Sequence, residues 1–217
     1  MNIERKLTSF YLVRHGETVW NVEQKMQGHK NSPLTQNGIQ QVKATGDKLK
    51  HITFNHIFSS DLLRARKSAK IIAADTDIAI KTTKLLRESS FGPFEGKKRE
   101  FYKKSLQKSI AYRQTLSGEE KMNYKIHPDI ESHNETTSRV FTFLRETAVA
   151  YPGTTILIVT HGGIIRSALV KLGFATNEEL PSGSISNAGY IVVESDGIEF
   201  FLKETVGIQK VIGPVTT

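Results

Sequence analysis

Short apolar runs at intervals along the chain predict the strands of a buried sheet. The run at 154–160 is nearly all apolar, as expected of a central parallel strand covered on both faces. The first run is rich in aromatic and branched residues, which strands favour. The predicted strands lie at 9–13, 55–60, 78–82 and 154–160, and a predicted hairpin follows at 188–194 and 198–203 around Ser-Asp-Gly.

Between these runs, apolar residues recur at the spacing of helices. Thr35 is placed to cap the first helix, and Ser132 with Glu135 forms the pattern of a capping box at the start of a later one. A further helix is expected from Gly162 to Gly173. The predicted helix faces consist of Ile39, Val42, Gly46 and Leu49, then Leu62, Ala65, Ala69, Ile72 and Ala73, and finally Val140, Phe143 and Leu144.

Strands that alternate with helices predict an α/β fold, a three-layer α/β/α sandwich with a mostly parallel central sheet. The stretch at about 92–130 is less regular, and its weakly amphipathic pattern predicts a helical lid inserted into the sandwich. Because the sequence shows no internal repeat, linker or low-complexity tract, we expect a single domain over 1–217. Active sites of such sheets usually lie beyond the carboxyl ends of the strands.

The composition narrows the classes of protein to consider. The 217 residues are 38% apolar and 24% charged, which is ordinary for a soluble protein, and no apolar run approaches the ~20 residues of a bilayer span. The absence of cysteine rules out disulfides and thiolate chemistry. A net charge of +8 fits either a generally basic surface or an anionic partner, and no nucleic-acid-binding motif is present. We therefore expect a cytoplasmic protein with a small anionic ligand and no nucleic-acid or membrane partner, and we leave its oligomeric state open.

Polar clusters follow three of the predicted strands, and one more lies in a loop. They are Arg-His-Gly-Glu-Thr at 14–18 with Asn21, Ser-Ser-Asp at 59–61 with Arg64, Thr-His-Gly-Gly at 160–163, and Arg87-Glu88. If the first, second and last of the predicted parallel strands are neighbours, the first three clusters meet at one edge of the sheet.

These residue types suit phosphoryl transfer. The transition state spreads negative charge over three oxygens, which Arg14 and Arg64 can bind with rigid, permanently charged forks. A neutral histidine can attack phosphorus and form a covalent intermediate, and a carboxylic acid can protonate the leaving oxygen. Gly16 and Gly162 would let the backbone approach a phosphate. Each signal alone is weak, since an Arg-His pair or a His-Gly-Gly turn is usually structural, and only their combination favours a catalytic site.

The combined pattern resembles the histidine phosphatase superfamily, in its phosphoglycerate mutase-like branch. The motif at 14–18 with Asn21 matches the family signature. Two departures, Ile130 where the family often has glycine and Phe94 where it often has Trp or Tyr, bear on substrate preference and remove no reacting group. The resemblance covers most of the chain except about 97–129, and it continues at 27–29, 33–35, Gly38, 60–62, 64–65, 86–88, 91–92, 94–96, 131–132, 139–140 and 159–163.

The resemblance implies a role for each matched residue. His15 would be the nucleophile and Glu88 the proton donor, with Glu17 as the rival carboxylate. His161 would take part in catalysis, and the phosphoryl group would be bound by Arg14, Arg64, Asn21 and His161. Gln27, Gly28 and Gly162 are candidates for contact with the substrate. The family needs no metal and no organic cofactor, and the sequence contains no metal-ligand motif such as His-Glu-x-x-His.

The stretch at 97–113 is strongly basic, and its only acidic residue is Glu100. It is either a lid that recognises a second negative group of the ligand or a solvated helix face.

The expected function is a phosphatase that hydrolyses phosphate monoesters of small phosphorylated metabolites through a phosphohistidine. The alternatives are a phosphoglycerate mutase, which returns the phosphoryl group to its substrate, and a non-catalytic module that binds phosphorylated ligands.

Overall fold

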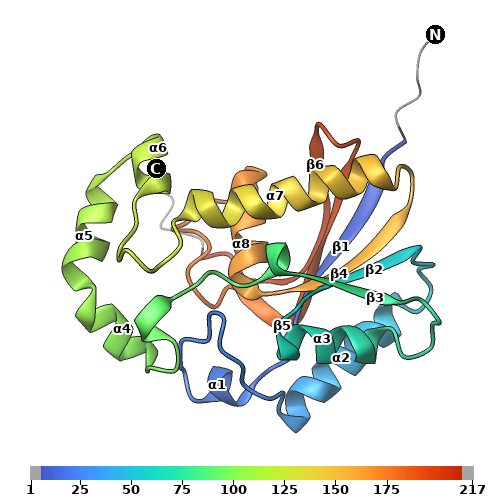
Figure 1. The fold of residues 1–217 in the computed structure, drawn as a ribbon, viewed down its shortest axis with the longest axis horizontal. Helices are drawn as coiled ribbons and strands as arrows, with labels where there is room; N and C mark the ends of the chain where they lie inside the picture. The colour runs from blue at the N-terminus through green and yellow to red at the C-terminus, as the bar shows by residue number, and fades with distance from the viewer. Residues whose placement is uncertain (1–5, 212–217) are drawn as a thin grey trace.

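Six strands form one mixed sheet at the centre of the computed structural model, which describes residues 6–211 (Figure 1). Across the sheet their order is β3-β2-β4-β1-β5-β6. Three pairs are parallel, whereas β5 is antiparallel to both β1 and β6, so β5 alone runs against the other five. The predicted mostly parallel sheet is therefore confirmed. The strands are β1 (Thr8–Arg14), β2 (His56–Ser60), β3 (Ile80–Thr83), β4 (Thr155–Thr160), β5 (Ile185–Ser195) and β6 (Phe200–Ile208).

Helices cover both faces of the sheet and complete the three predicted layers (Figure 1). Successive residues of β1 point to opposite faces, so Val13 packs against one helix pair and Leu12 against the other. Among the helices of residues 6–211, none is long and apolar enough to cross a membrane. The pair on the Val13 side is α2 (Gln36–Leu49) and α3 (Leu63–Ile72), and the pair on the Leu12 side is α7 (His133–Ala150) and α8 (Gly162–Lys171).

Both predicted helix caps are present. Thr35 Oγ1 accepts a hydrogen bond from the backbone N–H of Gly38 at 2.9 Å. Ser132 and Glu135 form the full capping box at the start of α7, with bonds of 3.1 and 2.7 Å. The buried face of α2 differs from the predicted one, because Gly38 and Thr45 are buried in place of Ile39 and Gly46.

The segment at 92–130 is helical, as predicted for the lid, and lies beyond the carboxyl ends of the strands (Figure 1). Phe94, Leu106 and Ile130 form a small apolar cluster of its own, apart from the two clusters of the sandwich. The shorter helical elements of the chain are α1 (Val19–Val22), η1 (Lys84–Leu86), η2 (Gly92–Phe94), α4 (Arg99–Ser105), α5 (Gln107–Thr115) and α6 (Gly118–Asn123).

Candidate active site

The polar clusters that follow β1, β2 and β4 meet at one edge of the sheet, as predicted. β4 lies between β1 and β2, and Arg14 at the end of β1 is level with Thr160 at the end of β4. A cavity of about 330 Å³ lies at this edge and extends to α4 and α5. The residues predicted from the sequence that line it are Arg14, His15, Asn21, Gln27, Gly28, Arg64, Glu88 and Gly162.

His15 lines the cavity with a side chain that is almost fully buried. Its Nδ1 lies 2.7 Å from the backbone oxygen of Gly16. Because a carbonyl oxygen only accepts, Nδ1 carries the proton and Nε2 keeps the lone pair. The Nε–H of Arg64 donates to that Nε2 at 3.3 Å, which agrees with the same tautomer. Burial, followed by the charges of Arg64 and Arg14, holds the pKa of His15 well below its ordinary value of 6.5, so the ring is neutral at pH 7.

Two guanidinium groups lie beside His15. Arg64, on α3, is 2% exposed and donates to the backbone oxygens of Gly28 at 2.7 Å and Lys30 at 2.8 Å. Arg14 donates through Nη1 to the backbone oxygen of Ile185. Burial lowers the pKa of each arginine to about 10, so both stay charged at pH 7.

His161 packs against His15 and does not line the cavity. The two ring centroids are 5.2 Å apart, at an interplanar angle of 64°. His161 is fully buried, and its Nε2 is 2.9 Å from Oγ of Ser60. Burial, followed by the charge of Arg64, holds the pKa of His161 well below 6.5 as well. The structure therefore brings His161 against His15 but not to the surface that lines the cavity.

Glu88 faces the cavity, whereas its rival Glu17 does not. The carboxylate of Glu88 accepts hydrogen bonds from the backbone N–H groups of Gly163 at 3.0 Å and Ser89 at 2.9 Å. The carboxylate of Glu17 instead accepts from Oγ1 of Thr35 at 2.7 Å, where it fixes the start of α2. Glu88 is thus placed for proton transfer in the cavity, and Glu17 is placed for a structural contact.

The backbone that carries Glu88 is held by Arg139, a residue to which the sequence assigned no role. Arg139 donates to the backbone oxygens of Arg87 at 2.7 Å and Glu88 at 3.1 Å, and it pairs with the carboxylate of Glu131 at 2.9 Å. The ring Nε2 of His29 lies 2.9 Å from the same Glu88 oxygen. His29 therefore supports the Glu88 loop and does not itself line the cavity.

Gly16 does not bring its backbone to the cavity, and that expectation was wrong. A Cβ at Gly16 would overlap the carbonyl of Gly38, and one at Gly38 would overlap the backbone of Glu17. The two glycines let the 14–18 loop contact the first turn of α2 directly, which is why Gly38 is buried. Gly162 does line the cavity, and a Cβ there would lie 3.0 Å from Nε of Arg14.

Asn187 contacts the 14–18 loop at His15 and was not singled out by the sequence analysis. Its Nδ2 donates to the backbone oxygen of His15 at 3.3 Å and to Oδ1 of Asn21 at 3.4 Å. The next residue, Ala188, donates its N–H to the same His15 oxygen at 3.3 Å and has a φ of 57°, which is unfavourable for alanine. Oδ1 of Asn21 also accepts from the backbone N–H of Thr18 at 3.1 Å, so Asn21 lines the cavity while it is fixed from two sides.

The basic stretch at 97–113 divides between cavity and solvent. Arg99 and Arg113 line the cavity, whereas the five lysines of the stretch are exposed. The expectation of a solvated face therefore holds for the lysines but not for the two arginines. Further lining residues that the sequence did not single out include Tyr102, Tyr124, His133, Arg166 and Ser182.

Several buried polar atoms of the site have no hydrogen-bond partner among the described residues. They include Nε of Arg14, Nε of Arg99 and Nδ1 of His161. Buried polar groups are nearly always paired, and guanidinium N–H groups are donors, so the two arginine Nε atoms, which belong to residues that line the cavity, fit a ligand that brings acceptor oxygens. Within residues 6–211, no group of three or more His, Asp or Glu side chains is arranged to hold a metal ion. The donors of the site therefore suit an anion.

A family model described as the histidine phosphatase superfamily (branch 1) matches residues 10–206. The chain belongs to this superfamily. It is 32% identical over 182 residues to the uncharacterized phosphatase PhoE of Bacillus subtilis, a match that covers 84% of this chain and 86% of PhoE. It is 37% identical over 152 residues to the probable phosphoglycerate mutase GpmB of Salmonella arizonae, which covers 70% of this chain and 68% of GpmB.

The fold of this histidine phosphatase superfamily member also matches solved structures. YhfR of Bacillus stearothermophilus is 27% identical, with a TM-score of 0.77, over 90% of this chain and 95% of YhfR. The predicted fold class and family are confirmed. The relatives carry the names of phosphatases and of mutases, and both kinds are enzymes.

Proposed function

We propose that this protein is a phosphatase that hydrolyses phosphate monoesters of small metabolites through a phosphohistidine at His15. The observation that carries the proposal is the state of the His15 ring. Its Nδ1–H is held by the Gly16 carbonyl, so the Nε2 lone pair lies at a cavity that is also lined by Arg14, Arg64 and Glu88. The name of PhoE, which matches this chain over most of its length, supports the same reaction class.

In the first step, the Nε2 lone pair of His15 attacks phosphorus and forms the N–P bond. The bond from phosphorus to the ester oxygen breaks, and its electron pair leaves with that oxygen, which takes a proton from Glu88. Arg14 and Arg64 bind the phosphoryl oxygens on which negative charge is spread. The Nε–H of Arg64 then turns from Nε2 of His15, its present acceptor at 3.3 Å, to a phosphoryl oxygen.

In the second step, Glu88 takes a proton from water while the water oxygen attacks phosphorus. The N–P bond breaks and returns its electron pair to Nε2, which restores the neutral ring. Glu88 is again protonated and ready for the next substrate. The Gly16 carbonyl, which accepts from Nδ1, stabilises the positive charge on the ring while the phosphohistidine exists.

The experiment that tests this proposal is the identification of the phosphorylated residue. The protein is mixed with p-nitrophenyl phosphate, quenched rapidly without acid, digested and examined by mass spectrometry. We expect phosphate on His15 and nearly complete loss of turnover in His15→Ala. His51→Ala is the matched control, because His51 is exposed and does not line the cavity. Phosphate on another residue would overturn the assignment, and no turnover of any phosphate monoester would favour a non-catalytic binding module.

A phosphoglycerate mutase is the second candidate, favoured by the likeness to GpmB. A mutase must keep its phosphohistidine away from water while the intermediate turns. Hydrolysis is favoured by the lid, because α4, α5 and α6 contain no buried residue, and Tyr102 of α4 and Ile110 of α5 are only partly buried where they pack against the small cluster of Phe94, Leu106 and Ile130.

The two reactions are separated by supplying 3-phosphoglycerate, with and without 2,3-bisphosphoglycerate. Free phosphate and 2-phosphoglycerate are both measured over time. We expect phosphate release to exceed isomerisation under both conditions. Formation of 2-phosphoglycerate much faster than release of phosphate would replace the phosphatase by the mutase.

A further inference from the structure

The cavity holds more positive charge than a single phosphate group would neutralise. Five arginines line it, and none of them takes part in an ion pair within residues 6–211. Two carboxylates line it, but Glu131 is paired with Arg139, so only Glu88 faces these arginines without a cationic partner. A phosphate group brings a charge of about −1.5 to −2 at pH 7. The five arginines are Arg14, Arg64, Arg99, Arg113 and Arg166.

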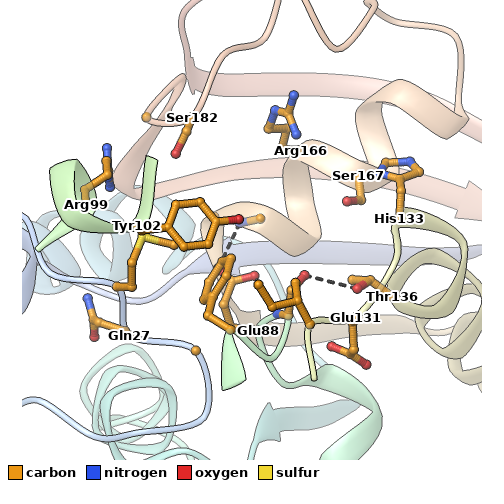
Figure 2. A pocket seen from close by; sticks show the side chains of 18 of the residues that line it. Gln27, Glu88, Arg99, Tyr102, Glu131, His133, Thr136, Arg166, Ser167 and Ser182 are labelled. Atoms are coloured by element: carbon orange, nitrogen blue, oxygen red, sulfur yellow. Dashed lines mark hydrogen bonds between the residues drawn. The ribbon is translucent and has the colours of Figure 1, made fainter. Parts of the chain in front are cut away.

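Four of the five arginines lie in two pairs at different parts of the cavity. Arg14 and Arg64 lie beside His15, at the reacting end. Arg113 of α5 and Arg166 of α8 lie near His133, the first residue of α7. Burial, followed by the charges of Arg113 and Arg166, lowers the pKa of His133 to about 4. Both arginines are therefore close enough to His133 to disfavour its protonated form. Figure 2 shows Arg166 and His133 together on the side of the cavity opposite Gln27 and Arg99.

Backbone carbonyls fix the two arginines of this outer end without neutralising them. Arg166 donates from Nε to the oxygen of Leu180 and from Nη2 to that of Asn177 at 2.9 Å. Arg113 donates from Nε to the oxygen of Lys121 at 3.2 Å, and no hydrogen bond within residues 6–211 reaches either of its Nη atoms. Both guanidinium groups are thus oriented by carbonyl oxygens and not by a carboxylate, as expected of a site that binds an anion.

We propose that Arg113 and Arg166, with His133, form a second anion-binding site, which takes a carboxylate or a further phosphate of the same substrate molecule. The inference rests on the proposed function and narrows its substrate class to phosphate monoesters that carry another anionic group. The cavity of about 330 Å³ is at the small end of ligand sites and is lined by His15, Arg113, Arg166 and His133 together, so a small metabolite is the kind of ligand that the two ends would share. The exposed lysines of 97–113 only steer anions, because solvent screens their charges.

The test uses pairs of substrates that differ in the second group alone. 3-Phosphoglycerate carries a carboxylate where glycerol 3-phosphate carries a hydroxymethyl group, and fructose 1,6-bisphosphate carries a phosphate that fructose 6-phosphate lacks. The kcat/KM of each is measured, together with calorimetric binding to His15→Ala, which does not depend on turnover. We expect the doubly anionic member of at least one pair to be favoured by about 10- to 100-fold, the range of one hydrogen-bonded charge.

The variants Arg113→Gln and Arg166→Gln should each reduce this preference by about 10-fold or more. Lys108→Gln is the matched control, since it removes the same charge from an exposed position of α5. Arg113→Gln is the decisive variant, because it breaks one backbone hydrogen bond where Arg166→Gln breaks two. If the doubly anionic members are not favoured, or if Lys108→Gln lowers the preference as much as Arg113→Gln, the second site is refuted. Absence of hydrolysis with a selective calorimetric signal would instead refute the phosphatase and retain the site.

Discussion

Gly163 separates the first turn of α8 from the carboxylate of Glu88, and its replacement by alanine tests the proposed proton donor without changing any charge. A Cβ at Gly163 would lie 2.3 Å from Oε1 and 3.0 Å from Cδ of Glu88. The backbone of Gly163 is helical, so alanine is compatible with its conformation. The substitution therefore acts on the position of the carboxylate, which would also lose its 3.0 Å bond from the Gly163 N–H.

The size of the effect follows from this geometry. To reach ordinary contact distance, the carboxylate must move by about 1 Å. A misplacement of about 1 Å typically costs about 100-fold in rate, or ~2.7 kcal/mol of transition-state stabilisation. A general acid typically raises the rate by about 100- to 10,000-fold. The loss expected for Gly163→Ala is therefore at the lower end of the loss expected if Glu88 were removed altogether.

The assay compares two leaving groups. A sugar alkoxide needs a proton as it departs, whereas p-nitrophenolate does not. Gly163→Ala should therefore slow sugar-phosphate hydrolysis by about 100-fold and slow the burst of p-nitrophenolate release much less. Gly46→Ala is the matched control, because a Cβ there meets Cα of Ile72 at an ordinary 3.5 Å, and it should leave both rates unchanged.

A double mutant gives the strictest form of the test. If Gly163→Ala acts through Glu88, adding it to Glu88→Gln should cost little more than Glu88→Gln alone. Equal losses on the two leaving groups, or fully multiplicative effects in the double mutant, would refute the assignment of Glu88 as the proton donor.

Three further predictions concern His15 and its surroundings. Arg64→Ala should cost ~3–4 kcal/mol of transition-state stabilisation, measured from kcat/KM, and it should lower the free energy of unfolding in urea by about 1–3 kcal/mol, because the buried carbonyl of Gly28 loses its donor. The pKa values of His15 and His161 are held well below 6.5 in the fold, so below about pH 6.5 the unfolded chain binds protons that the folded chain does not. The free energy of unfolding should therefore fall from pH 7 to pH 5, by at most ~1.4 kcal/mol per pH unit for each ring, and His15→Gln should reduce that slope. Activity should survive excess EDTA, and loss with recovery on addition of a divalent ion would contradict the proposed chemistry.

The strands and helix starts could be predicted because their causes are local. The apolar runs that became β1, β2 and β4 are buried on both faces, and the side chains of Thr35 and Ser132 cap the helices that directly follow them. The buried face of α2 was predicted less well, because the contact that buries Gly38 comes from the 14–18 loop rather than from the helix. The spacing of apolar residues within a helix does not show which distant loop will pack against it.

The candidate catalytic residues could be placed for a similar reason. His15, Arg64 and Glu88 lie in short motifs next to strands and helices, and the sheet order then brings those motifs together. The residues that hold them in place could not be predicted, because each forms hydrogen bonds with residues far away in the sequence. Asn187 contacts a residue 172 positions away, and Arg139 contacts a carbonyl 51 positions away. A lone Asn or Arg in a sequence does not reveal which distant carbonyl it binds.

Arg64 shows how closely the support of this site and its chemistry are joined. The same guanidinium reaches Nε2 of His15, the atom proposed to attack, and the carbonyls of Gly28 and Lys30 in the loop that lines the cavity. That loop is fixed from its other side by Glu95, whose carboxylate accepts from the N–H of Lys30 at 3.1 Å. One buried side chain therefore contacts both His15 and the cavity wall. Lysine at this position would keep the charge but could not reach three acceptors in fixed directions, which is why an arginine is needed.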